Sequence, residues 1–173
     1  MNLLIQLGLL LRAVAEIDGR KKLQKMVHIL QEFGVPFEVR YGYHHYGPFS
    51  EQLQDGVQSY RQDGLIHETP VVSQYPTSRF KADSRLLGLL ELVSTETPTW
   101  APFALELNKK SPRELEAIST ILYLQKQPGE EQSPDKVDES FLKLKPGLKE
   151  LLPRAKSVIT DFRARYSGLQ QAA

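Results

Sequence analysis

The sequence lacks cysteine and the common catalytic motifs. None of the 173 residues is cysteine, which excludes disulfide bonds, thiolate metal sites and a cysteine nucleophile. There is also no glycine-rich phosphate loop, no Gly-x-Ser-x-Gly elbow and no His-Glu-x-x-His motif. We therefore expect a non-enzymatic protein without a cofactor, and we assign no catalytic residue.

An excess of charge of one sign is also missing. The chain has 22 Lys and Arg residues against 21 Asp and Glu residues, which gives a net charge of +1. Proteins that coat nucleic acid usually have a global basic excess. Any binding of nucleic acid would therefore depend on a local basic patch.

The longest apolar run is too short to cross a membrane. It covers Leu3 to Leu11, whereas a spanning helix needs about 20 residues. No Lys or Arg precedes this run and Arg12 follows it, an arrangement that secretory signals seldom have. We interpret the run as a buried first helix and expect a cytoplasmic protein with no membrane partner.

The first third of the chain predicts two helices and a strand. The first helix is expected over residues 2–17, because Asp18-Gly19 is a typical helix stop. The second is expected over residues 20–33, where apolar residues recur at steps of three and four. Residues 37–45 then alternate with period two, which predicts a half-buried strand that Gly47-Pro48 ends. Its predicted inner positions are Phe37, Val39, Tyr41, Tyr43 and His45.

Ser50 is a typical cap for a third helix, which Gly64 would stop. Residues 65–69 and 77–82 resemble two short strands joined by residues 70–76. The order helix, helix, strand, helix, hairpin is that of a winged helix-turn-helix, with the third helix in the recognition position and the hairpin as wing.

The second half is predicted to be helical. We expect a helix over 86–93, a loop over 95–102, helices opening at Ser111 and at Ser133, and a polar linker over 127–132. Pro153 would either kink the last helix or lie in its first turn, and the final residues 167–173 should be frayed.

The predicted fold class is thus α+β. We expect a helix-rich, winged helix-turn-helix-like domain over residues 1–85, with additional C-terminal helices over 86–173 packed on it. One single domain is the alternative.

A basic cluster marks the candidate nucleic-acid contact. Positive charge at a helix start is disfavoured by the helix dipole, so its presence there suggests an anionic partner. Three further cations in or after the predicted wing would add phosphate contacts. The candidates are Arg20, Lys21, Lys22, Lys25, Arg79, Lys81 and Arg85. The alternative is a solvated basic face, the usual meaning of a charge run.

The predicted recognition helix opposes DNA binding. It carries Glu51, Asp55 and Asp63 but only Arg61 as a cation, so phosphates would repel it. Its glutamines, at positions 52, 54, 58 and 62, have the chemistry to read base edges, although exposed glutamines are common.

The histidines and tyrosines have structural explanations. Adjacent His44 and His45 would point to opposite faces of a strand, so both cannot bind one metal ion, and we predict no metal site. Tyr41, Tyr43 and Tyr46 have the chemistry to stack on bases, but aromatic residues at strand spacing usually belong to a core.

Residues 20–66 resemble a known family. The helix Arg20 to Gly34, the sequence Tyr46-Gly-Pro-Phe-Ser50 and the helix that ends at Asp63-Gly-Leu-Ile66 are similar to the YwgA-like family of uncharacterised bacterial proteins. They are more distantly similar to the Panacea antitoxin domain, from which the pattern at Leu23 to Leu30 departs. The resemblance implies a bacterial, cytosolic protein of winged-helix character, and antitoxin or adaptor roles through protein contacts.

Two functions follow from these patterns. The first is a regulatory or binding protein with DNA as a possible partner. The alternative is a protein-interaction or antitoxin-like adaptor module, which would bind a protein partner or form a homodimer. Residues at alternating steps of four and three form a packed or coiled seam that could serve this role. The seam residues are Leu148, Leu152, Ala155, Ile159, Phe162 and Tyr166.

Overall fold

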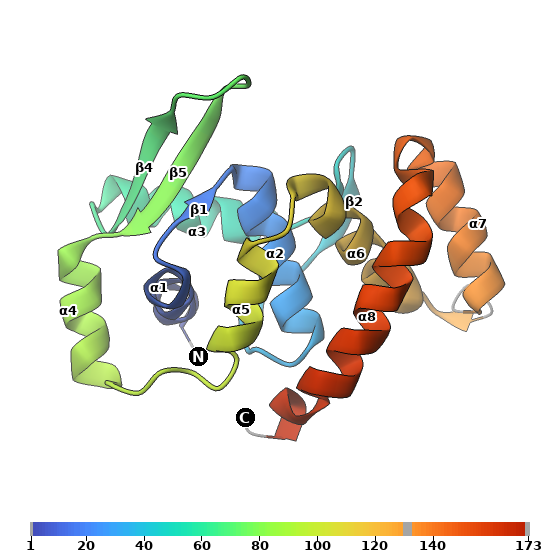
Figure 1. The fold of residues 1–173 in the computed structure, drawn as a ribbon. Helices are drawn as coiled ribbons and strands as arrows, with labels where there is room; N and C mark the ends of the chain where they lie inside the picture. The colour runs from blue at the N-terminus through green and yellow to red at the C-terminus, as the bar shows by residue number, and fades with distance from the viewer. Residues whose placement is uncertain (1, 130–132, 172–173) are drawn as a thin grey trace.

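The computed structural model describes residues 2–129 and 133–171. It is rich in helix and contains a small antiparallel sheet, so the predicted α+β class is confirmed (Figure 1). The elements up to residue 82 are α1 (Leu3–Val14), β1 (Ile17–Asp18), α2 (Arg20–Glu32), β2 (Gly42–His44), β3 (Gly47–Phe49), α3 (Glu51–Gln62), β4 (Ile66–Val71) and β5 (Thr77–Ala82).

The second half is helical. Its elements are α4 (Ser84–Val93), α5 (Ala101–Asn108), α6 (Pro112–Gln125), α7 (Pro134–Leu144), the 3-10 helix η2 (Pro146–Leu151), α8 (Leu152–Tyr166) and the 3-10 helix η3 (Ser167–Gln171). One hydrophobic core joins this half to the first, because α2 packs on α5 and α6 while α1 packs on α4 and α5.

The first helix is shorter than predicted. It ends at Val14, Ala15 adopts a φ of 67°, and Ile17 and Asp18 form β1 instead of the last helical turn. This strand pairs with β5, where Ile17 lies opposite Phe80. The prediction of helix to residue 17 was wrong. Residues 17 and 18 form a strand because they pair with β5, which lies some sixty residues later in the sequence.

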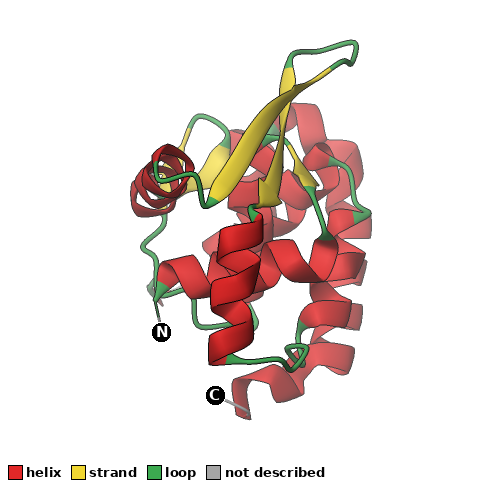
Figure 2. Cartoon of the chain, turned by 90° about the vertical axis from the view of Figure 1, so that its left-hand side faces the viewer, coloured by secondary structure: helices red, strands yellow, loops and turns green. Residues whose placement is uncertain are grey.

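The sheet has the order β1-β5-β4, with antiparallel neighbours. The hairpin of β4 and β5 is longer than predicted, since Pro70 and Val71 pair with Ser78 and Thr77. The hairpin projects away from the helices (Figures 1 and 2).

The predicted strand over residues 37–45 was mostly wrong. Only Gly42–His44 form a strand, and they pair with Gly47–Phe49, so Gly47-Pro48 continues a short hairpin rather than ending the pairing. The alternation still predicted the buried side correctly for Phe37 and Val39, while His45 is exposed.

Two glutamines of α2 replace a strand partner for this segment. Gln31 donates from Nε2 to the carbonyl of Val39 at 2.9 Å and accepts from its amide at 3.0 Å. Gln24 does the same for Ser50, at 2.9 Å and 3.1 Å. Each side-chain amide thus satisfies both main-chain groups of one residue, as a neighbouring strand would.

Most helix boundaries of the second half follow the predicted signals. Ser111 forms the predicted capping box with Glu114, and Pro153 lies in the first turn of α8. Ser133 precedes α7, but its side chain makes no capping hydrogen bond. The predicted loop over 95–102 is shorter, because α5 begins at Ala101.

Two predictions fall partly outside the described residues. These are the polar linker, at residues 130–132, and the frayed end, at 172–173; residues 167–171 form η3.

The seam of α8 and η2 lies inside the chain. Leu148, Leu152, Ile159 and Phe162 are each 8% exposed or less, and α8 packs on α6 while Tyr166 is half-buried. The prediction that these residues form a surface for a partner is therefore corrected: their periodicity reflects packing on this chain's own helix.

Replacing Gln24 with leucine should destabilise the fold. The substitution removes both hydrogen bonds between Gln24 and Ser50, so the buried main-chain amide of Ser50 has no acceptor. This loss should lower the free energy of unfolding by about 1–3 kcal/mol. Urea unfolding measures this change. Gln62→Leu, at the exposed end of α3, is the matched control and should change the free energy of unfolding by less than about 0.5 kcal/mol. Equal effects of the two substitutions would contradict the assigned role.

Candidate functional site: the cleft between α2 and α3

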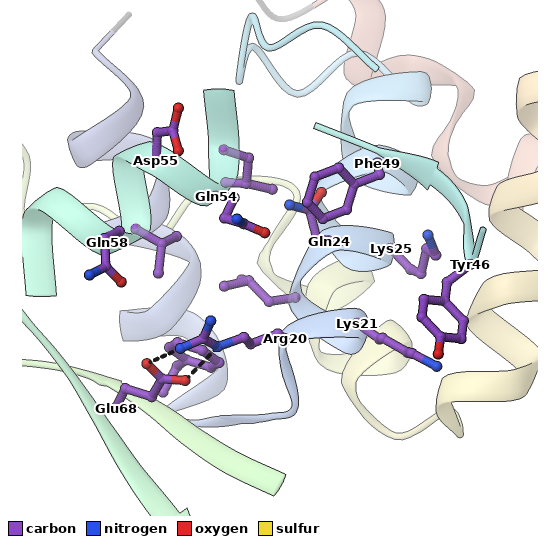
Figure 3. A pocket seen from close by; sticks show the side chains of 14 residues that line it. Arg20, Lys21, Gln24, Lys25, Tyr46, Phe49, Gln54, Asp55, Gln58 and Glu68 are labelled. Carbon is purple, nitrogen blue, oxygen red and sulfur yellow. Dashed lines mark hydrogen bonds and ion pairs between the residues drawn. The ribbon is translucent and has the colours of Figure 1, made fainter. Parts of the chain in front are cut away.

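A cavity of about 200 Å³ lies between the start of α2, one face of α3 and the β2–β3 hairpin (Figure 3). Its floor is apolar and its rim is polar. The floor is formed by Leu23, Phe49, Leu53, Val57 and Phe80, and the rim by Arg20, Lys21, Gln54, Asp55, Gln58 and Glu68.

Local interactions fix the direction of α3 beside this cleft. The Ser50 hydroxyl accepts from the amide of Leu53 at 3.1 Å, as the sequence predicted, and Leu53 is fully buried. On another side of the helix, a Cβ on Gly56 would lie 2.8 Å from a methyl group of Leu3. This glycine therefore allows α3 to pack closely on α1.

Arg20 is neutralised at one end of the cleft. Its Nε lies 2.7 Å from Oε1 of Glu68, and Nη1 of Arg61 lies 2.8 Å from the other oxygen of this carboxylate (Figure 3 shows Arg20 and Glu68). The Glu68 side chain is only 7% exposed, and the hydrogen bond from Arg20 lowers its pKa. Arg20, whose side chain is 61% exposed, thus pairs with a buried carboxylate and is not a cation without an acidic partner.

The lysines of the predicted basic cluster point in different directions. Lys21 is exposed and its Nζ lies 3.3 Å from the centroid of the Tyr46 ring, a cation–π contact at the other end of the cleft. Lys22 donates to the carbonyl of Asn108, and burial lowers its pKa. Lys25 is buried and donates to the carbonyl of Pro48. Only Lys21 extends into solvent.

The cations near the hairpin lie outside the cleft and have acidic partners. Arg79 binds Asp18 through two nitrogens, each at 2.7 Å, and Lys81 lies 3.0 Å from Glu16. Arg85 lies 3.3 Å from Asp83 and donates to the carbonyls of Asp63 and Gly64. The structure therefore does not unite the seven predicted basic residues in one patch.

A buried charge cluster lies behind the cleft. Lys145 binds Glu116 at 2.6 Å and donates to the carbonyl of His45 at 3.2 Å. Burial is the main cause that lowers the pKa of Lys25 to about 8; Glu116 opposes this shift, and the positive charges of Lys145 and Lys21 add to it. No sequence pattern indicated this cluster, because its members come from α2, α6 and the residue after α7.

The histidines are explained by their neighbours. His28 is buried, with Nδ1 at 2.8 Å from the Ser119 hydroxyl, and burial lowers its pKa to about 3, so it is neutral near pH 7. His67 lies 2.7 Å from Asp83. Within residues 2–129 and 133–171, no group of three or more His, Cys, Asp or Glu is placed to hold a metal ion.

Sequence patterns found parts of the cleft but not the cleft itself. Leu53 and Val57 come from one face of α3, and Val57, which packs against the core, also forms part of the cleft lining. Phe80 comes from β5, and Leu23 from the apolar stripe of α2. No single-element periodicity shows that these side chains meet around an open space.

Comparison with known proteins gives one informative match. The chain is 37% identical over 112 residues to the uncharacterized protein YwgA of Bacillus subtilis strain 168. This match supports the resemblance to YwgA-like proteins. The match covers 62% of this chain and 66% of that protein, so the chain spans slightly less than two thirds of its relative. No family model matches the sequence, and no solved structure matches it significantly. None of the helices described is long and apolar enough for a membrane span.

The buried Lys25 should make stability rise with pH. Its folded pKa of about 8 lies below the ordinary 10.5, so the unfolded chain binds more protons between these values. The free energy of unfolding should increase by roughly 2 kcal/mol from pH 8 to pH 10. Above that range the raised pKa values of Tyr41 and Tyr43 act in the opposite direction.

Denaturant unfolding over this pH range is the measurement. In Lys25→Met the increase should be largely lost, whereas Lys21→Met, a change to an exposed lysine of the same helix, should retain it. The same pH dependence in both variants would show that Lys25 does not cause it.

Proposed function

We propose that this chain is a non-enzymatic binding protein that accepts one large apolar side chain of a partner polypeptide in the cleft between α2 and α3. The observation that carries the proposal is the apolar lining of the cleft, where Phe49 and Val57 are partly exposed above the buried Leu23 and Leu53. Arg20 is paired with Glu68 and Lys22 is turned towards the carbonyl of Asn108, so the cleft suits an apolar anchor better than an anionic polymer.

The size of the cleft supports an anchor side chain over a larger ligand. Pockets for small molecules and cofactors usually enclose about 300–1,000 Å³. The volume of about 200 Å³ here suits a single aromatic or long aliphatic residue, the type that dominates binding energy at protein interfaces.

The rim supports an extended peptide with charges on both sides of the anchor. Gln54 and Gln58 project from α3 at one edge, where their amides can bond to a peptide main chain (Figure 3). Lys21 lies at one end and Asp55 at the other (Figure 3). A complementary peptide would carry an acidic residue near Lys21 and a basic residue near Asp55. An antitoxin-like adaptor would bind its partner protein through a contact of this kind.

Selection from a library of short displayed peptides tests this function. We expect selected peptides to share one large apolar residue between an acidic and a basic residue. Val57→Glu places a charge on the floor and should raise the dissociation constant of these peptides roughly thirtyfold or more, measured by fluorescence anisotropy. Leu144→Glu, at a 44% exposed leucine of α7, should leave it unchanged. If Val57→Glu weakens none of the selected peptides, the cleft is not the binding site.

DNA binding by a winged helix is the second candidate function. The strand order β1-β5-β4 and the hairpin that follows α3 support it, since a winged helix has a hairpin after its third helix. The β2–β3 hairpin does not fit, because residues 33–50 separate α2 from α3 where a helix-turn-helix has a turn of about 3–4 residues. In this arrangement α3 is the recognition helix and the projecting hairpin is the wing. The ion pairs of Arg20, Arg79 and Lys81 argue against it, because these cations would have to exchange carboxylates for phosphates.

A mobility-shift titration with duplex DNA tests the second candidate. Winged-helix binding predicts a shift at about 50 mM salt that weakens steeply towards about 200 mM, because phosphate contacts release counterions. Lys21→Glu and Lys81→Glu should each weaken it roughly tenfold, while Lys149→Glu on η2 should not. The absence of a shift from the wild-type chain at low salt removes this candidate without affecting the peptide-binding proposal.

A further inference from the structure

The walls of the cleft between α2 and α3 carry groups that interact with aromatic rings. The cavity is lined by the rings of Tyr46, Phe49 and Phe80 and by the guanidinium group of Arg20. Aromatic side chains attract one another in offset and edge-to-face arrangements, and they attract cations to their faces. Aliphatic side chains gain only from burial and packing. The lining therefore distinguishes between the two kinds of apolar side chain that the size of the cavity allows.

Phe49 is the ring that is both restrained and open to a ligand. It lies in β3, and the imidazole ring of His44 lies beside it with a distance of 5.0 Å between the ring centroids. Phe49 is half-buried and lines the cavity, whereas Phe80 is only 1% exposed. The Tyr46 ring already has Nζ of Lys21 at 3.3 Å from its centroid. A ring that enters the cleft would therefore pack mainly on Phe49.

The guanidinium group of Arg20 is held in a fixed orientation on a different side of the cleft from Phe49 (Figure 3). Its Nε and Nη2 donate to the two oxygens of Glu68 at 2.7 Å and 2.8 Å. This two-point contact fixes the plane of the group. Figure 3 shows the third nitrogen, Nη1, directed away from Glu68 and into the cleft. A guanidinium N–H that meets the face of an aromatic ring makes a favourable cation–π contact.

An aliphatic anchor would fit the same place less well. It would remove water from Nη1 of Arg20 without offering an acceptor, and burial of a polar group without a partner is costly. The face of an aromatic ring compensates in part for the lost water, because its π electrons attract the positive charge. The aliphatic part of the lining, Leu23, Leu53 and Val57, suits either kind of anchor. Phe49 and Arg20 are therefore the residues that decide between them.

We propose that the anchor accepted by the cleft is an aromatic side chain, which packs on the Phe49 ring and receives Nη1 of Arg20 on its face. The inference rests on the proposed function, because it specifies the partner of the same cleft. The partner polypeptide then carries phenylalanine, tyrosine or tryptophan at the anchor position. Its acidic and basic residues keep the places beside Lys21 and Asp55.

A pair of synthetic peptides tests the kind of anchor. Two versions of the tightest selected peptide differ only at the anchor, which is phenylalanine in one and its saturated counterpart, cyclohexylalanine, in the other. Burial alone predicts equal or tighter binding of the cyclohexyl peptide, because its ring is at least as apolar. We expect the phenylalanine peptide to bind roughly threefold or more tightly, measured by fluorescence anisotropy. Equal or tighter binding of the cyclohexyl peptide overturns the aromatic anchor, while weaker binding by Val57→Glu would still mark the cleft as the site.

Two variants test the roles of Phe49 and Arg20. Phe49→Leu keeps the lining apolar, and Arg20→Lys keeps a positive charge beside Glu68 without the planar group. Each should bring the ratio of the two dissociation constants closer to one, and because the ratio is taken within one variant, a small loss of stability does not affect it. Tyr75→Leu is the matched control, since this ring is 73% exposed at the tip of the β4–β5 hairpin, and it should leave the ratio unchanged.

Two results would contradict the inference. A ratio that neither Phe49→Leu nor Arg20→Lys changes shows that these residues do not select the anchor. Selected peptides that Val57→Glu does not weaken bind elsewhere, which removes the proposed function of the cleft and this inference together.

Discussion

The polar side chains of α2 hold the segment between α2 and α3 in place, and the cleft depends on this segment. Gln31 and Gln24 each satisfy the amide and the carbonyl of one residue, Val39 and Ser50. Tyr41 donates to the carbonyl of Gln24 at 3.1 Å, which ties the segment back to the same helix. Since buried main-chain groups without partners are costly, these contacts allow an irregular path where a sheet would otherwise be needed.

Gln24 links this arrangement to the candidate site. By fixing Ser50, it also fixes the residue whose hydroxyl caps α3. The direction of α3 then sets where Leu53 and Val57 lie relative to α2. The close packing of Gly56 on Leu3 restrains the same helix from another side. The position of the apolar lining of the cleft therefore depends on α3, which is held by the Ser50 cap at its start and by the contact of Gly56 with Leu3.

Pairing of charges decides what kind of surface the chain presents. Glu68 binds both Arg20 and Arg61, and Glu16 lies beside both Arg79 and Lys81. Exposed pairs of this kind contribute little stability individually. Their effect on recognition is larger, because they reduce the free positive charge that a run of basic residues would otherwise offer to phosphates, although Glu68 balances the charge of only one of its two arginines. Lys21 and Arg20 are both exposed cations at the mouth of the cleft.

The sequence by itself determined the class of fold and most of the secondary structure. Helical periodicity, the Ser50 and Ser111 caps and the two strands of the projecting hairpin depend on near neighbours, so their signals are local and were found. The similarity to YwgA-like proteins also came from local motifs. The candidate site was predictable only in part: Arg20 and Lys21 were singled out, but as phosphate contacts rather than as parts of a rim around an apolar floor.

Only the tertiary structure decided which elements cover which faces. Residues 17 and 18 form a strand because β5 lies beside them, and Val39 pairs with a glutamine side chain instead of a strand. Two apolar periodicities that look alike in the sequence have opposite outcomes: Phe162 is buried on this chain's own helices, while Leu92 faces solvent. Periodicity shows that a helix has an apolar face, but the partner for that face is set by contacts between residues far apart in the sequence.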